Sequence, residues 1–153
     1  MEKELTGGPS IASFATYIRN TLSLPDTDIK TYSPLTLAYI GDSIYDLIIR
    51  TVIVEKGNAP VNKLHKSTIK FVQASAQAEL YYSIMDQLTE EEMSMYKRGR
   101  NAKSFTTAKN AGIVEYRTAT GFEALMGYLY LTDQTERMIE LIKPQIEKMV
   151  SNS

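Results

Sequence analysis

Two short segments far apart in the chain each place carboxylates and glycines inside an otherwise apolar helical pattern. The first is YIGDSIYD at 39–46, and the second is TGFEALMG at 120–127. A buried carboxylate is costly unless it has a partner, so the pattern predicts that the two segments meet and pool their acids. A shared Mg²⁺ is the partner we expect, because this cation prefers oxygen ligands.

Three acids carry this expectation. Asp42 and Asp46 stand four residues apart, on one face of a helix, and Glu123 occupies a similar apolar setting in the second segment. Gly41 costs a helix roughly 1 kcal/mol against alanine, which indicates close approach by another helix or a ligand. Structural roles stay open: Asp42 could cap another segment, and Glu123 has the spacing from Thr120 of a capping box.

A basic stretch, KRGRNAKS at 97–104, lies between the two acidic segments. From residue 97 to residue 117 there are six basic residues and one acid, in a chain whose formal net charge is −1. This local excess predicts a surface for an anionic partner, with an ordinary solvated loop as the alternative. Acids for a metal and bases for phosphate together indicate a nuclease.

The bulk composition predicts one globular domain. The 153 residues are 43% hydrophobic and 23% charged, and none is cysteine. The length suffices for a core, and thiol catalysis and thiolate metal sites are excluded. We expect a cytoplasmic protein without a membrane partner, because no apolar run approaches the roughly 18 residues of a span and no secretory signal is evident. Residues 1–10 are expected to be a flexible tail, and 11–153 the single domain.

Apolar residues spaced by three or four predict helices nearly throughout, and hence an all-α fold. The expected helices cover 11–22, 34–55, 61–85 with an irregularity near Val72 or Ser75, 90–98, about 118–131 and about 133–150. Ser33 before Pro34, and Thr89 with Glu92, are start signals. Thr132 and Asp133 are expected to cap the last helix, and 99–110 to form an exposed loop.

The ordered blocks resemble the ribonuclease III family. AYIGDSIYD at 38–46 resembles the signature helix of its catalytic domain, and FEALMGYLYL at 122–131 resembles its second acidic helix. LHK at 64–66, KRGRNAKS at 97–104 and YR at 116–117 fit best the Mini-ribonuclease III pattern, the short bacterial form without a double-stranded-RNA-binding domain. The resemblance covers about 34–142.

The resemblance implies a ribonuclease III endonuclease-like helical bundle that forms a homodimer through the signature helix. It implies Mg²⁺-dependent cleavage of double-stranded RNA, with Mn²⁺ able to substitute, giving 5′-phosphate and 3′-hydroxyl ends. Asp42 and Glu123 match the catalytic metal ligands, and Asp46 matches an acid close behind them. Ala38 and Thr120 replace carboxylates of full-length ribonuclease III, so we expect more water on the metal and weaker Mg²⁺ affinity.

The resemblance also implies an RNA-binding surface and a substrate. The surface consists of basic and polar side chains from two segments: Lys97, Arg98, Arg100, Asn101, Lys103, Ser104, Lys109, His65 and Lys66. These suit the phosphates and 2′-hydroxyls of A-form RNA. The implied substrate is the precursor of large-subunit (23S) ribosomal RNA, with a ribosomal protein as a possible helper. Ala108 stands where the subfamily often has proline.

Two other functions compete with the nuclease. One is a non-catalytic RNA-binding scaffold of the same fold, and the other is a helical interaction protein without an RNA partner. Retention of both Asp42 and Glu123 argues against a pure scaffold, because acids that face phosphate do not help binding. The basic excess argues against a protein without an RNA partner.

Overall fold

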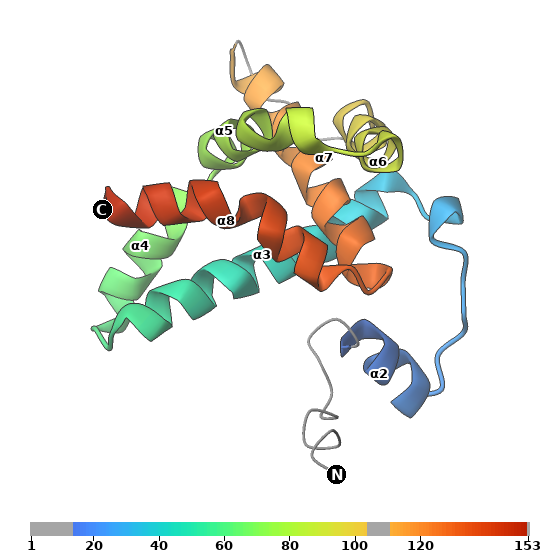
Figure 1. Ribbon diagram of the computed structural model, residues 1–153, viewed down its shortest axis with the longest axis horizontal. Helices are drawn as coiled ribbons and strands as arrows, with labels where there is room; N and C mark the ends of the chain where they lie inside the picture. Colours follow the sequence, from blue (N-terminus) through green and yellow to red (C-terminus); the bar gives the residue numbers. More distant parts are fainter. Residues whose placement is uncertain (1–13, 104–110, 153) are drawn as a thin grey trace.

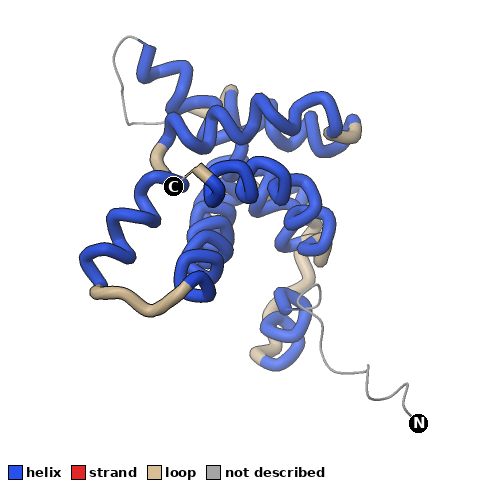
Figure 2. The backbone as a smooth tube through the Cα atoms, turned by 60° about the vertical axis from the view of Figure 1, so that its left-hand side comes forward, coloured by secondary structure: helices blue, strands red, loops and turns tan. Residues whose placement is uncertain are grey.

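A computed structural model describes residues 14–103 and 111–152 of the chain. Within these ranges the chain is almost entirely helical and contains no strand (Figures 1 and 2), which confirms the all-α expectation. The expected tail at 1–10 lies outside the described residues. The elements are α2 (Phe14–Thr21), η2 (Ile29–Thr31), α3 (Pro34–Lys56), α4 (Val61–Val72), α5 (Ala74–Ile84), η3 (Met85–Gln87), α6 (Glu90–Arg100), α7 (Ala111–Leu131) and α8 (Thr135–Ser151).

Helix α7 runs through the middle of the molecule and crosses α3, while α5, α6 and α8 pack around them (Figure 1). Along most of its length α7 is enclosed on every side, and Phe122, Leu125 and Leu129 have no exposed surface. Such a helix must be apolar around its whole circumference. None of the described helices has the length and apolarity needed to cross a bilayer.

The crossing of α3 and α7 brings two glycines against main chain. A Cβ atom on Gly41 would overlap the carbonyl oxygen of Glu123, and a Cβ atom on Gly127 would overlap the carbonyl oxygen of Leu37. The two helices therefore touch backbone to backbone, which no other residue type would allow. The close approach that Gly41 predicts is confirmed.

Local start and stop signals behave as the sequence predicts. The Ser33 hydroxyl accepts a hydrogen bond from the Leu35 amide, with Pro34 in the first turn of α3, and Gly57 ends that helix. Thr89 and Glu92 form both hydrogen bonds of a capping box at the start of α6. The predicted irregularity in 61–85 is a break at Gln73, between α4 and α5.

Two predicted helix starts are wrong. Helix α7 begins at Ala111 rather than near Thr118 or Thr120, because the Thr120 hydroxyl donates to the carbonyl of Tyr116 inside the helix instead of capping it. The capping-box explanation of Glu123 therefore fails. Helix α8 starts at Thr135 after Gln134, and Asp133 has a positive φ of 59° and accepts a hydrogen bond from Thr16 on α2.

We expect Gly127→Ala to destabilise the protein by about 3 kcal/mol, because the added methyl group must push α3 and α7 apart. Alanine ordinarily stabilises a helix interior by roughly 1 kcal/mol against glycine, so the sign of the change is diagnostic. Urea unfolding followed by circular dichroism measures it. Ser94→Ala, an exposed change on α6, is the control and should stay within about 0.5 kcal/mol of the wild type. A Gly127→Ala protein as stable as the wild type would contradict the close crossing.

Candidate active site

The glycine crossing brings Asp42 and Glu123 together. Asp42 directly follows Gly41 on α3 and is exposed, whereas Glu123 lies on α7 and is half-buried. The two carboxyl groups are close enough to hydrogen-bond each other. The predicted meeting of the two acidic segments is therefore observed.

The charge state of Glu123 is strongly affected by its surroundings. Burial raises the pKa of the Glu123 carboxyl to about 8, and the neighbouring Asp42 carboxylate pushes this pKa in the same direction. Two carboxylates side by side repel each other, so without a cation one of them holds a proton near neutral pH. A carboxyl whose pKa is raised by burial and by a specific charged neighbour is typical of functional sites.

A glutamine that the sequence analysis did not select also contacts the pair. Gln77 on α5 is 2% exposed, and its amide hydrogen-bonds with the Glu123 carboxyl and lowers its pKa, against the larger effect of burial. The same amide donates to the carbonyl of Val72 over 2.9 Å. The sequence signal that could have identified Gln77 is its position as the one amide in the mostly apolar run 76–81.

Asp46 lies one turn beyond Asp42 on α3 and is engaged differently. Its carboxylate accepts a 2.7 Å hydrogen bond from the guanidinium of Arg50. This ion pair supplies Asp46 with a positive partner inside its own helix. The structure thus brings Asp42, Glu123 and Gln77 together, whereas Asp46 contacts Arg50 further along α3.

The donor set of this site suits a hard divalent cation with a partly hydrated shell. Among the described residues there is no cluster of three His, Cys, Asp or Glu side chains. Mg²⁺, however, usually keeps several waters and takes only one or two protein carboxylates. Asp42 and Glu123 provide these two, and a cation between them would remove their repulsion. The buried Oε1 atom of Gln77 has no hydrogen-bond partner in the part of the chain that the structure describes, so an unused acceptor also lies in this group.

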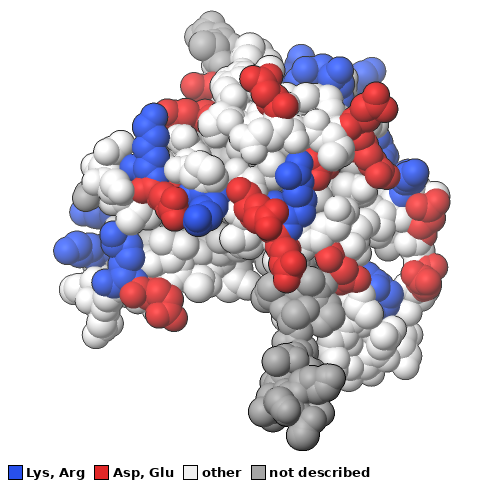
Figure 3. Space-filling model, in the orientation of Figure 1, with Lys and Arg blue, Asp and Glu red and all other residues white. Residues whose placement is uncertain are grey.

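The residues predicted to bind RNA are spread over α4 and the end of α6. His65 and Lys66 are exposed on α4, and Lys97, Asn101 and Lys103 are exposed in or just after α6. Ser104 and Lys109 lie outside the described residues. On the face shown in Figure 3, charges of both signs are interspersed, and basic side chains gather at the left, over α4.

The two arginines of the basic stretch have structural contacts. Arg98 is half-buried and donates a 2.7 Å hydrogen bond to the carbonyl of Tyr32, just before α3. Arg100 lies over the ring of Tyr96, with 5.7 Å between the guanidinium carbon and the ring centre. Lys97, Arg98 and Asn101 also line an open groove of about 770 Å³ along α6. These contacts orient the basic end of α6 relative to the core.

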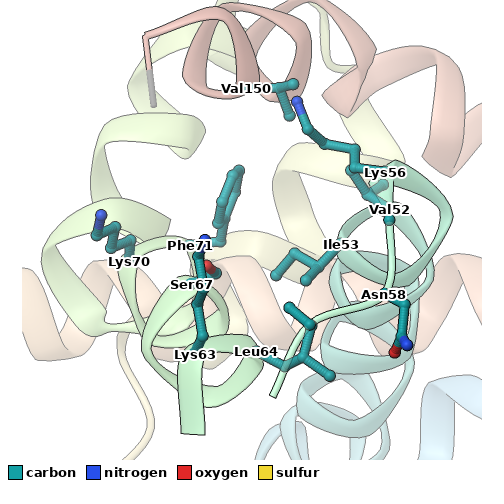
Figure 4. A pocket seen from close by; sticks show the side chains of 12 residues that line it. Val52, Ile53, Lys56, Asn58, Lys63, Leu64, Ser67, Lys70, Phe71 and Val150 are labelled. Atoms are coloured by element: carbon teal, nitrogen blue, oxygen red, sulfur yellow. The ribbon is translucent and has the colours of Figure 1, made fainter. Parts of the chain in front are cut away.

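A separate pocket of about 280 Å³ lies between α3, α4 and the end of α8, away from the acids. Its apolar side chains include Ile53, Leu64 and Phe71, and Lys56, Lys63 and Lys70 stand around them (Figure 4). Among the described residues, its lining contains no carboxylate and no histidine. The pocket therefore lacks the usual side-chain ligands of a metal, and the Asp42–Glu123 pair remains the candidate centre.

Comparison with known proteins shows which family this chain resembles. Residues 35–134, well over half of the chain, match the family model of the ribonuclease III domain. The chain is 54% identical to the Mini-ribonuclease 3 of Clostridium tetani over 117 residues, covering 76% of this chain and 78% of the relative. It is 46% identical to that of a Thermoanaerobacter species over 147 residues, covering 96% and 97% of the two chains.

A solved structure has the same fold. The crystal structure of a Fusobacterium nucleatum protein superposes with a TM-score of 0.71 at 33% sequence identity. The match covers 80% of this chain and 98% of that one. The helical architecture described above is thus also found in an experimentally determined structure.

The raised pKa of Glu123 predicts how the metal-free protein responds to pH. A carboxyl whose folded pKa of about 8 exceeds its unfolded value of 4.5 favours the folded state at low pH, and this contribution is lost progressively as pH rises from 4.5 to about 8. We expect Glu123→Gln to remove this loss and to stabilise the protein at pH 8.5 by about 2 kcal/mol, a value that allows for solvent screening of the half-buried group. Thermal melts in EDTA from pH 5 to pH 9 test this. Asp86→Asn, an exposed change in η3, is the control, and parallel curves for wild type and Glu123→Gln would disprove the expectation.

Proposed function

This chain belongs to the ribonuclease III family, in its Mini-ribonuclease 3 group, and we propose that its paired acids hydrolyse double-stranded RNA with Mg²⁺. Membership makes the chain an endoribonuclease that acts on RNA. The observation that carries the proposal is the contact between Asp42 and Glu123, two acids that repel each other unless a cation or a proton lies between them.

The proposed chemistry assigns each group a simple task. Asp42 and Glu123 hold Mg²⁺, with Mn²⁺ able to take its place, and Asp46 supports them from the next turn of α3. When bound, the cation lowers the pKa of a coordinated water and neutralises charge on the attacked phosphate. The acids must lose their shared proton to bind it, so cation affinity rises with pH. The products are a 5′-phosphate and a 3′-hydroxyl.

We further propose that basic and polar side chains around α4 and the end of α6 bind the RNA backbone. They are Lys97, Arg98, Arg100, Asn101, Lys103, Ser104, Lys109, His65 and Lys66. Basic groups, amides and hydroxyls of this kind match the phosphates and 2′-hydroxyls that shape-dependent readers of A-form RNA contact. The substrate we propose is the 23S ribosomal RNA precursor, processed in the cytoplasm with a ribosomal protein as helper.

Cleavage of a long double-stranded RNA tests the proposed reaction. We expect the wild type to shorten the RNA in Mg²⁺ and not in EDTA, and Asp42→Asn and Glu123→Gln each to lower the rate at least 100-fold, more than loss of a supporting residue typically costs. Asp86→Asn should cleave normally. RNA that all the proteins shift on a gel but leave intact would favour the non-catalytic scaffold. A duplex of the paired ends of the 23S precursor, with and without ribosomal proteins, tests the proposed substrate.

The exposed side of α3 supports a homodimer. Large apolar side chains along this side are exposed to solvent. Leu35, Leu47 and Val54 are exposed, and Tyr39 is 78% exposed. Leu35, Tyr39 and Leu47 share one side of the helix with Asp46, next to Asp42. Tyrosine on an exposed apolar strip is typical of an interface. A second copy of α3 would cover these residues and set two acidic sites near each other, one for each RNA strand.

Tyr39→Arg tests the dimer, because it places a charge in the middle of the proposed interface. We expect the wild type to sediment as a dimer at micromolar concentration and Tyr39→Arg to sediment as a folded monomer with reduced double-strand cleavage. Tyr82→Arg replaces a 54% exposed tyrosine on α5 and is the matched control, which should remain dimeric. A monomeric wild type, or a dimeric Tyr39→Arg protein, would contradict this interface.

A further inference from the structure

Gln77 is a buried amide whose orientation is fixed by two acceptors. Its nitrogen donates to the Val72 carbonyl over 2.9 Å, and the same NH₂ group has a second hydrogen for the Glu123 carboxylate beside it. The Val72 carbonyl can only accept, so the nitrogen must face it, and the NH₂ group can donate to Glu123 when that carboxyl is ionised. The amide oxygen is therefore the end that remains free.

This free oxygen is buried and has no hydrogen-bond partner among the described residues. A buried acceptor left unpaired costs about 1–3 kcal/mol. Native proteins commonly fill such a position with an ordered water or an ion. The oxygen belongs to the side chain that contacts Glu123, which places an unused acceptor at the edge of the acidic pair.

We propose that Gln77 is a positioning residue of the active site, whose NH₂ group holds the Glu123 carboxylate and whose Oε1 accepts a hydrogen bond from a water of the bound cation. The inference rests on the proposed metal function of Asp42 and Glu123. It adds a residue from a third helix, α5, to a site otherwise built from α3 and α7. The chain thereby gains an oxygen near the cation at a site where Ala38 and Thr120 provide no carboxylate.

A purely structural role would explain the contact of the Gln77 NH₂ group but not the buried amide oxygen. Helix α4 ends at Val72, so its last carbonyls have no partner within the helix. The Tyr45 hydroxyl donates to the carbonyl of Phe71 over 3.2 Å, and the Gln77 amide donates to the carbonyl of Val72. This capping uses the NH₂ group of Gln77 alone. It gives no reason for a buried oxygen, whereas hydration of a cation does.

Binding of Mn²⁺ to the RNA-free protein separates the two roles, with electron paramagnetic resonance to count free Mn²⁺. Gln77→Met keeps the length of the side chain and removes both polar ends. We expect it to weaken Mn²⁺ binding about 10- to 100-fold, as the loss of a residue that orients a metal ligand typically does. Gln77→Glu restores acceptor oxygens and should bind Mn²⁺ at least as tightly as the wild type. Thr68→Val removes a buried hydroxyl on α4 and should leave the affinity unchanged.

Thermal melts in EDTA complete the test. The Val72 contact predicts a lower melting temperature for both Gln77 variants, whatever Gln77 does for the cation. If Gln77→Met binds Mn²⁺ as tightly as the wild type, the proposal is overturned and Gln77 only caps α4. If Gln77→Glu binds Mn²⁺ as weakly as Gln77→Met, the proposed role of the amide oxygen is overturned. Wild-type protein that binds Mn²⁺ no better than Asp42→Asn would instead overturn the metal function itself, and this inference with it.

Discussion

The main-chain contact between α3 and α7 is the constraint on which the site depends. Gly41 and Gly127 have no side chain, so the two helices approach until carbonyl groups fill the space that a Cβ would take. Gly99 and Gly121 play a similar part where α6 packs on α7. With helices this close, a carboxylate on each reaches the other directly. The position of the acids is thus set by backbone packing rather than by flexible side chains.

This packing holds together two groups that repel each other. Burial and the charge of Asp42 both oppose ionisation of Glu123, so the folded protein carries an electrostatic cost at its centre. The apolar surroundings supply the compensation, since Tyr45, Phe122 and Leu125 close to the acids are fully buried. Such local conflict with the rest of the fold is expected at functional sites. A divalent cation between the two acids, as proposed above, would relieve this repulsion.

What could be predicted from the sequence follows from the range of the interactions. Ser33, Gly57 and the Thr89–Glu92 box act within one turn of their own helix, and each was predicted correctly. Thr120 and Asp133 carry the same kind of local signal, but the first bonds within its helix and the second bonds to Thr16. The two acids were identifiable as glycine-flanked carboxylates in apolar runs. The contact of Gln77 with them was not, because it joins residues 46 positions apart through the packing of α5 on α7.

The break at Gln73 has a mechanical consequence. The carbonyls of Phe71 and Val72, which this break leaves without helical partners, are held by Tyr45 from α3 and Gln77 from α5. Straightening or bending the junction would strip hydrogen bonds from two buried side chains, so it should behave as a rigid elbow rather than a hinge. A displacement of α4 would then also move the side chains of Tyr45 and Gln77, because they are hydrogen-bonded to the junction. The junction therefore fixes the position of Gln77, the side chain that contacts Glu123, relative to α4.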